Sequence, residues 1–189
     1  MIKNLKHYIF KLDKFINEKI CDEILLNLKD EDFKEHTFYN VNSDSFRSQS
    51  DEKQDPLVSY ESVNGRDKLT KQLWYAIQKY MDYIDCSWYQ NWNGYLIPRF
   101  LRYKENKKMA FHCDHTHSLF DGERKGIPVL SVVGTLNEDY EGGDFIMFEN
   151  YKIKFKKGDV LIFPSNFLYP HKIEPITKGT RNSYVSWVW

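Results

Sequence analysis

Two segments in the N-terminal half of the chain repeat their apolar residues at the spacing of an α-helix. In the first segment Asn17 can cap a helix, and the apolar positions that follow are Ile20, Cys21, Ile24, Leu25 and Leu28. In the second segment the apolar positions are Leu69, Leu73, Ala76, Ile77, Tyr80 and Ile84. Residues that recur at i+4 and i+7 fall on one face of a helix. The pattern therefore predicts helices over residues 18–29 and 67–84.

Beyond residue 84 the apolar pattern changes to short runs and alternation, which are typical of strands. Glycine, asparagine and proline residues separate these runs, as expected of turns. The eight predicted strands are residues 95–103, 108–114, 128–137, 144–149, 151–156, 159–163, 169–174 and 180–188. The pattern predicts a mainly β fold with N-terminal helices, of the α+β class, in which the antiparallel strands form a jelly roll or barrel.

The polar segment over residues 40–65 is rich in serine and aspartate and lacks periodicity, so it is predicted to be a long loop. A chain of 189 residues that is 41% hydrophobic suits one domain with a buried core. We therefore expect a single domain over residues 1–189. In it, residues 1–94 supply helical support and a lid loop, and residues 95–189 supply the β core.

The charge balance limits the classes of partner. Basic and acidic residues both number 27, so the formal net charge is zero and nucleic acid is not an expected partner. Lysines interrupt the apolar residues near the N-terminus, and no later stretch reaches transmembrane length, so no membrane association is expected. The three cysteines, Cys21, Cys86 and Cys113, are far apart and fit neither a disulfide framework nor a zinc motif. We expect a soluble, cytoplasmic protein with reduced thiols.

Candidate metal ligands cluster in the second predicted strand. Because side chains alternate along a strand, His112 and Asp114 point to one face while Cys113 points away. A third ligand must come from elsewhere, and His171 is the only histidine that follows the group at residues 112–117. Two imidazoles and one carboxylate suit an Fe(II) oxygenase site with open coordination positions. The alternative is a chance spacing on a strand, with His171 as an ordinary hydrogen-bonded residue.

Other residues near these three in the sequence could contribute to the same site. His115 and His117 could act as alternative ligands or as donors to the ligands, although His115 has the wrong strand parity and His117 falls in a loop. Arg181 follows His171 by an even offset, across a predicted turn over residues 175–180, so its guanidinium can return to the same face. A guanidinium is a natural partner for a carboxylate. Lys178 has an odd offset, and Arg181 could instead be a surface residue of the last strand.

Several motifs follow one another in order: Tyr103, His112-x-Asp114, Glu141-Gly142-Gly143-Asp144-Phe145, Lys157-Gly158-Asp159-Val160-Leu161-Ile162-Phe163-Pro164, His171 and Arg181-x-Ser183. This ordered set resembles the 2-oxoglutarate and Fe(II)-dependent oxygenase superfamily. Within it, the set is most similar to the prolyl 4-hydroxylase-like catalytic domain. The resemblance covers roughly residues 95–189 and is far more specific than any one motif.

The resemblance implies a double-stranded β-helix core, the cupin-like jelly roll, and a role for each matching residue. The implied iron ligands are His112, Asp114 and His171. Arg181 takes the position that binds the distal carboxylate of 2-oxoglutarate, where collagen-type prolyl hydroxylases often carry lysine. Tyr103 matches a tyrosine that assists this contact, with a plain core aromatic as the alternative, and Ser183 contributes as well.

The resemblance also implies an activity. It is hydroxylation of a prolyl residue in a protein or peptide, with Fe(II), 2-oxoglutarate and O2, with succinate and CO2 as co-products, and with ascorbate as reductant. A free amino acid or another small metabolite is the alternative substrate, because residues 43–62 and 115–127, expected to line the mouth, contain no recognition code. Two other readings are a cupin-like metal enzyme without 2-oxoglutarate turnover and a jelly-roll binding module without catalysis.

Overall fold

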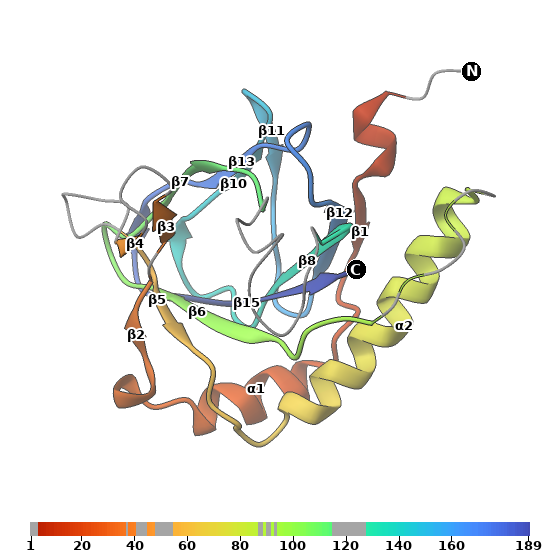
Figure 1. Ribbon diagram of the computed structural model, residues 1–189. Coiled ribbons are helices and arrows are strands. Elements are labelled where there is room, and N and C mark those ends of the chain that lie inside the picture. Colours follow the sequence, from red (N-terminus) through yellow and green to blue (C-terminus); the bar gives the residue numbers. More distant parts are fainter. Residues whose placement is uncertain are drawn as a thin grey trace.

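The computed structural model describes residues 4–36, 38–40, 45–47, 55–86, 89, 92, 94–114 and 128–189 (Figure 1). Its helices are the 3-10 helix η1 (Leu5–Tyr8), α1 (Glu18–Asn27), the 3-10 helix η2 (Asp30–Asp32) and α2 (Arg66–Ile84). Within these ranges, no helix is both long enough and apolar enough to cross a membrane.

Antiparallel strands form two larger sheets and two smaller strand pairs. The seven-stranded sheet has the order β1 (Phe10–Leu12), β12 (Val160–Pro164), β8 (Leu130–Thr135), β15 (Arg181–Val188), β6 (Arg99–Tyr103), β5 (Leu57–Ser59) and β2 (Lys34–Glu35). The four-stranded sheet has the order β11 (Tyr151–Ile153), β10 (Phe145–Met147), β13 (His171–Ile173) and β7 (Met109–His112). The two strand pairs are β14 (Ile176–Lys178) with β9 (Glu141–Gly142), and β3 (Phe38–Asn40) with β4 (Ser45–Arg47).

The seven-stranded sheet separates two hydrophobic cores, because its side chains alternate between faces. On β6, Phe100 belongs to the core shared with the helices, whereas Leu101 and Tyr103 belong to the core between the two sheets. On β15, Tyr184 faces the helices and Val185 faces the four-stranded sheet. Two antiparallel sheets around one core give the jelly roll, and the predicted fold class, mainly β with N-terminal helices, is confirmed.

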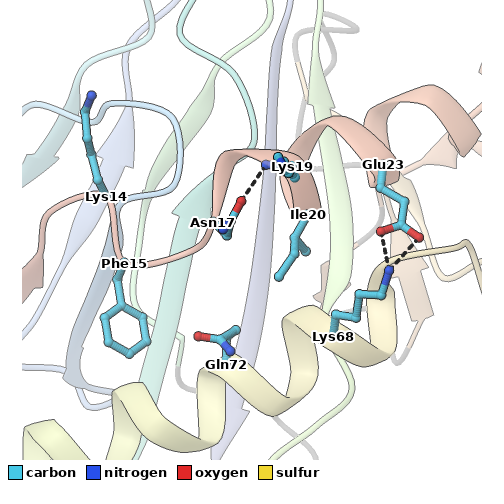
Figure 2. A pocket seen from close by; sticks show the side chains of 8 residues that line it. All are labelled: Lys14, Phe15, Asn17, Lys19, Ile20, Glu23, Lys68 and Gln72. Carbon is cyan, nitrogen blue, oxygen red and sulfur yellow. Dashed lines mark hydrogen bonds and ion pairs between the residues drawn. The ribbon is translucent and has the colours of Figure 1, made fainter.

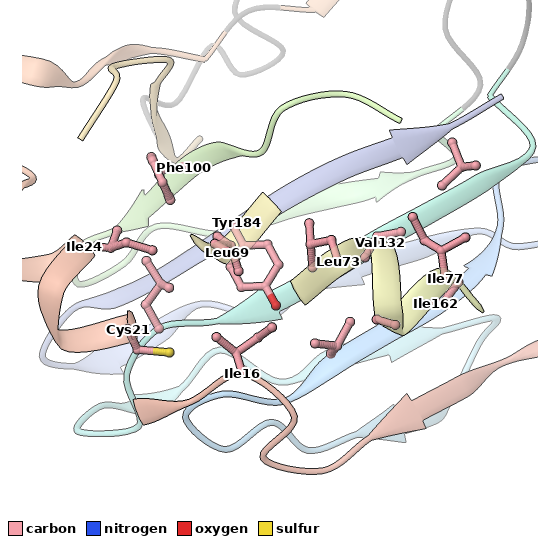
Figure 3. Packing of buried hydrophobic residues seen from close by; sticks show 14 of the residues in the cluster. Ile16, Cys21, Ile24, Leu69, Leu73, Ile77, Phe100, Val132, Ile162 and Tyr184 are labelled. Carbon is pink, nitrogen blue, oxygen red and sulfur yellow. The ribbon is translucent and has the colours of Figure 1, made fainter. Parts of the chain in front are cut away.

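The helices α1 and α2 lie along the outer face of the seven-stranded sheet (Figure 1), and Figure 3 shows their apolar side chains packed against it. The side chain of Asn17 caps α1 by accepting a hydrogen bond from the backbone N–H of Lys19 at 2.9 Å. Gly65 precedes α2 with a φ of +90°, and a Cβ there would lie 2.9 Å from Cγ1 of Ile24. The buried face of α2 consists of Leu69, Leu73, Ala76, Ile77, Tyr80 and Ile84, the series that predicts it.

Element boundaries differ from the prediction where the pattern is weak. The first helix ends at Asn27 rather than at residue 29, because the backbone of Leu28 is extended, with a φ of −84° and a ψ of 106°. The strand predicted over residues 95–103 is regular only from Arg99, and Tyr95 forms an isolated bridge with Val188. The turn predicted over residues 175–180 contains β14, which pairs with β9.

The N-terminal half also contributes strands that the sequence pattern does not predict. The strands β1, β5 and β2 come from residues before 95, and they extend the seven-stranded sheet at its two edges. Elements of two or three residues are too short to display a period. The loop predicted over residues 40–65 contains β4 and β5, and its residues 41–44 and 48–54 lie outside the described part of the chain.

The fully buried carboxylate of Asp159 binds the N-terminal segment to the seven-stranded sheet. It accepts hydrogen bonds from the backbone N–H groups of Lys14 at 2.7 Å and Lys156 at 2.8 Å. The ammonium group of Lys11 lies 2.6 Å from it, and the Asp159 side chain is 0% exposed. The same ammonium group pairs with Asp13, whose side chain is 80% exposed. Two carboxylates of very different burial therefore share one lysine.

Asp159→Ala should lower the free energy of unfolding by about 3 kcal/mol, because it leaves buried donors and a partly buried cation without their acceptor. Asp13→Ala removes the exposed carboxylate beside the same lysine and should cost less than about 1 kcal/mol. Urea unfolding monitored by circular dichroism measures both losses. Equal losses in the two variants would contradict the anchoring role of Asp159.

Candidate metal centre

Two of the predicted metal ligands face each other across neighbouring strands. In the pairing of β7 with β13, His171 lies directly opposite His112. Opposed residues of an antiparallel pair place their side chains on the same face, and the two imidazole centroids lie 4.4 Å apart. Asp114 follows just beyond the end of β7. The strand register thus brings together residues that are far apart in the sequence.

The three side chains surround a space suited to one metal ion. Oδ1 of Asp114 lies 3.5 Å from Nε2 of His112 and 3.8 Å from Nε2 of His171. The three ligand atoms all lie within 4.8 Å of one another. A metal with bonds of about 2.1 Å to nitrogen and oxygen holds adjacent ligands about 3 Å apart, so a small inward movement completes the set. Within the described residues, this is the one group of three such side chains that could hold a metal.

The backbone orients both imidazoles for coordination through Nε2. Nδ1 of His112 lies 2.8 Å from the carbonyl oxygen of Ala110, and Nδ1 of His171 lies 3.1 Å from that of Tyr169. A carbonyl oxygen only accepts hydrogen bonds, so a neutral imidazole carries its proton on Nδ1 in this arrangement. The lone pair on Nε2 then points toward Asp114. Such hydrogen bonds commonly fix the tautomer of metal-binding histidines.

Asp114 is ionised despite its burial. Burial alone raises the pKa of a carboxyl group, but His171, His112 and a hydrogen bond from Ser131 outweigh it and hold the pKa of Asp114 well below its usual range. The Ser131 hydroxyl donates to Oδ2 at 2.6 Å. Oδ2 is thereby held by the protein, whereas Oδ1 faces the two imidazoles.

His171 is neutral within an aromatic surround. Its ring stacks on Phe145 with centroids 5.2 Å apart, and it meets the edge of Phe163 at 5.0 Å. Burial lowers the pKa of His171 to about 4, although Asp114 acts in the opposite direction. For His112, burial likewise opposes protonation, but the interaction with Asp114 prevails and raises its pKa. The centre therefore combines the neutral imidazole of His171, the carboxylate of Asp114 and the imidazole of His112. A metal cation could replace the proton on His112 as the positive charge beside this carboxylate.

Arg181 enters the same inter-sheet core. It lies opposite Tyr103 in the pairing of β15 with β6, and its side chain is buried. The guanidinium carbon lies 5.3 Å from the Tyr103 ring centroid and 5.7 Å from that of Phe155. Phe155 in turn contacts Phe145, which stacks on His171. Arg181 thus points inward, although His171 belongs to the other sheet and the two are not joined by a simple hairpin.

The remaining predicted residues occupy different places. Ser183 is buried on β15, two residues after Arg181. The exposed ammonium group of Lys178 pairs with Glu141 at 3.1 Å, so it does not compete with Arg181. His115 and His117 lie outside the described residues.

Sequence reasoning missed the polar residues around the three candidate ligands. Ser131 stands in an apolar run and resembles an ordinary strand residue, yet its hydroxyl bonds Asp114. Trp187 lies opposite Ser131 on β15, and the guanidinium carbon of Arg99 lies 4.4 Å from the centroid of its ring. Strand parity identified the interior face but gave no sign of these contacts.

A separate groove of about 530 Å³ lies between the start of α1 and the first turns of α2 (Figure 2). It contains none of the predicted site residues. Lys14 and Lys19 border it, and the ammonium group of Lys68 is neutralised by Glu23 at 2.7 Å. Its chemistry is that of a solvated helix surface.

The C-terminal half of the chain matches a known family. Residues 98–189 match the model of the 2OG-Fe(II) oxygenase superfamily. A PKHD-type hydroxylase of Xylella fastidiosa (strain M12) is 34% identical over 110 residues, covering 49% of this chain and 44% of the relative. A PKHD-type hydroxylase of Herminiimonas arsenicoxydans is 33% identical over 100 residues, covering 50% and 44%. The chain spans less than half the length of these curated relatives.

Solved structures of low sequence identity share the fold. A Trichoplax adhaerens prolyl hydroxylase, solved with a peptide fragment of hypoxia inducible factor, has a TM-score of 0.69 at 17% identity and covers 97% of this chain and 84% of its own. A Pseudomonas putida prolyl-4-hydroxylase has a TM-score of 0.66 at 15% identity, with coverage of 96% and 92%. The predicted resemblance is thereby confirmed: residues 98–189 match the 2OG-Fe(II) oxygenase superfamily, and the chain shares the fold of prolyl hydroxylases.

We expect the purified chain to bind one equivalent of Co(II), an optical probe for Fe(II), and His171→Ala to lose this binding. The reason is that the remaining imidazole and carboxylate cannot hold the ion alone. His7→Ala, which removes a histidine outside the centre, is the matched control. Anaerobic titration of the cobalt absorption bands measures the stoichiometry. Unchanged binding in His171→Ala would exclude this centre.

Ser131→Ala should weaken Co(II) binding by about tenfold to a hundredfold, because the carboxylate of Asp114 loses the hydrogen bond that orients it. Ser186→Ala is the control, since Ser186 is also fully buried but donates its hydrogen bond to the carbonyl of Leu96. The same cobalt titration, run with both variants, compares their affinities. Equal weakening in the two variants would indicate a general packing effect.

Proposed function

We propose that this chain is a 2-oxoglutarate-dependent Fe(II) hydroxylase that acts on a prolyl residue in a protein or peptide. In this proposal His112, Asp114 and His171 hold the iron. Arg181, assisted by Tyr103 and Ser183, binds the distal carboxylate of 2-oxoglutarate. Succinate and CO2 are the co-products, and ascorbate serves as the reductant in the cytoplasm.

The observation that carries the proposal is the unpaired charge of Arg181. Its side chain is 3% exposed, and among the described ion pairs no carboxylate is its partner. Its Nε is buried without a hydrogen bond. An unpaired buried charge is costly, so a site of this kind favours an anionic ligand. A dicarboxylate that reaches the three candidate metal ligands with one end meets this need with the other.

The surroundings of Arg181 suit a bidentate carboxylate. Burial raises the pKa of Tyr103 to about 12, so its hydroxyl stays protonated and can donate a hydrogen bond beside the guanidinium. Gly143 lies against this side chain, because a Cβ there would come within 3.3 Å of Cδ of Arg181 and within 2.4 Å of Cδ1 of Ile176. The Glu141–Phe145 motif therefore makes room for the arginine.

The chain's own residues position the reactants and exclude water. Bound Fe(II) supplies the activation of O2 coupled to decarboxylation of 2-oxoglutarate. His112 and His171 present Nε2 through backbone hydrogen bonds at Nδ1, Ser131 fixes Oδ2 of Asp114, and the rings of Phe145 and Phe163 shield His171. Arg181 sets the orientation of the co-substrate.

The choice of a prolyl substrate is supported by the solved neighbours that are prolyl hydroxylases, one of them holding a peptide. A cupin-like enzyme without 2-oxoglutarate turnover, or a jelly roll that only binds, would leave the charge of Arg181 without a purpose. The buried guanidinium therefore favours the oxygenase reading over both.

Protein reconstituted anaerobically with Fe(II) and 2-oxoglutarate, then exposed to air, should form succinate. Arg181→Gln should raise the KM for 2-oxoglutarate by about a hundredfold or more, because two charge-assisted hydrogen bonds contribute about 3 kcal/mol. The KM of Arg181→Lys for 2-oxoglutarate should lie between those of Arg181→Gln and the wild type, since lysine keeps the positive charge but lacks the planar guanidinium that binds a carboxylate through two hydrogen bonds. Mass spectrometry measures the formation of succinate by the wild type and the two variants.

Lys178→Gln is the matched control, because it removes a nearby exposed cation that pairs with Glu141. Its KM for 2-oxoglutarate should equal that of the wild type. Iron-loaded wild type that makes no succinate and binds no 2-oxoglutarate would overturn the proposed function.

A further inference from the structure

A second arginine lies on the interior face of the seven-stranded sheet, at the opposite end of β6 from Tyr103. Arg99 has the strand parity of Leu101 and Tyr103, which face the inter-sheet core. It pairs with Val185 on β15, so its diagonal neighbour on the same face is Trp187. Its side chain is half-buried and reachable from solvent.

The strand register connects this arginine to the candidate metal centre. Trp187 lies directly opposite Ser131 in the pairing of β15 with β8. The Ser131 hydroxyl donates to Asp114 at 2.6 Å, and the guanidinium carbon of Arg99 lies 4.4 Å from the centroid of Trp187. Arg99, Trp187, Ser131 and Asp114 therefore follow one another across a single surface. Arg99 lies at its solvent end and Asp114 at its inner end.

The guanidinium of Arg99 has polar and aromatic neighbours but no described carboxylate partner. One amino group donates to the hydroxyl of Tyr60 at 3.2 Å, and the other lies 3.4 Å from Nε2 of His36. Burial, followed by the charge of Arg99, lowers the pKa of His36 to about 4, so this neighbour is neutral. The Nε–H of Arg99 and the indole N–H of Trp187 are both buried without a hydrogen-bond acceptor.

The next arginine on the same strand shows how this chain satisfies a structural guanidinium. Arg102 points to the other face and pairs with Asp30 at 2.5 Å. It also donates to Asn182 at 2.9 Å and to the carbonyl of Leu28 at 3.2 Å. Arg102 is thus held by one carboxylate and two further hydrogen-bond acceptors. Arg99 lies at the open end of the site, and its Nε–H has no hydrogen-bond acceptor.

The backbone positions of Arg99 and Arg181 lie well apart on the interior face. Arg181 pairs with Tyr103, four residues along β6 from Arg99, which corresponds to about 13 Å along a strand. In the proposed function Arg181 takes the far carboxylate of 2-oxoglutarate, so the anion assigned to Arg99 is a different one.

We propose that Arg99, stacked on Trp187, binds a carboxylate of the substrate and so restricts this site to acidic substrates. The inference rests on the proposed function and specifies its substrate class. The carboxylate can come from an aspartyl or glutamyl side chain of a peptide, or from the α-carboxylate of a free amino acid or peptide terminus. Either source places a planar carboxylate opposite the guanidinium of Arg99.

A panel of defined compounds tests the proposal on the Fe(II)-loaded protein. It contains blocked proline peptides with Asp or Glu at each flanking position, their Asn and Gln analogues, the same peptides with a free C-terminal carboxylate, and free proline with its amide. Binding and hydroxylation are followed by mass spectrometry together with succinate. Wild type should prefer carboxylate-bearing members over their matched amides by about tenfold or more. The side-chain and terminal series identify the source of the carboxylate.

Variants at position 99 complete the test. Arg99→Gln should lose the preference for carboxylate-bearing members, and Arg99→Glu should shift it toward peptides with lysine in place of the acid. Lys104→Gln, which removes an exposed charge just beyond β6, should keep the wild-type preference. The proposal is overturned if wild type selects no carboxylate-bearing member, if Arg99→Gln keeps the preference, or if Arg99→Gln raises the KM for 2-oxoglutarate as Arg181→Gln does. Absence of any succinate in wild type would instead mark failure of the proposed function.

Discussion

The negative charge of Asp114, whose side chain is only 9% exposed, is the constraint on which the arrangement of the centre depends. Burial alone would favour the neutral acid, and the charge persists because Ser131 holds Oδ2 while two imidazoles face Oδ1. Those imidazoles can converge only because β7 and β13 pair with His112 opposite His171. A shift of that register by one residue would turn one imidazole to the other face of the sheet and leave the carboxylate with one of its two imidazole partners.

The alternation of side chains on β6 and β15 divides the molecule into a structural and a chemical side. Phe100 and Tyr184 face the helices, whereas Tyr103, Arg181 and Trp187 face the four-stranded sheet. Each inner arginine lies on aromatic rings, which support a planar cation without neutralising it. The outer arginine, Arg102, is neutralised by Asp30. On these two strands the outer guanidinium has an acid as its partner. The two inner guanidinium groups have no carboxylate partner among the described ion pairs, and they lie on the sheet face that is turned toward the candidate metal ligands of the other sheet.

The parts of this account that could be predicted from sequence are those that depend on local periodicity or on ordered motifs. The face shared by His112 and Asp114 follows from strand alternation, and the second helix follows from an apolar series that spans its whole length. The pairing of His171 with His112 depends on which strands become neighbours, which no local pattern reveals. Ser131 and Arg99 were missed for the same reason, because each looks like an ordinary strand residue until the register places it near Asp114 or Trp187. The strands β1, β2 and β5 are too short to display a period.

The central claim is that the space between the two sheets binds both a metal ion and 2-oxoglutarate. An anaerobic crystal structure of the chain with Mn(II) and 2-oxoglutarate tests it most directly. The account predicts the metal between Nε2 of His112, Nε2 of His171 and the carboxylate of Asp114, with the far carboxylate of 2-oxoglutarate on the guanidinium of Arg181. A metal bound elsewhere, or 2-oxoglutarate bound away from Arg181, would contradict it.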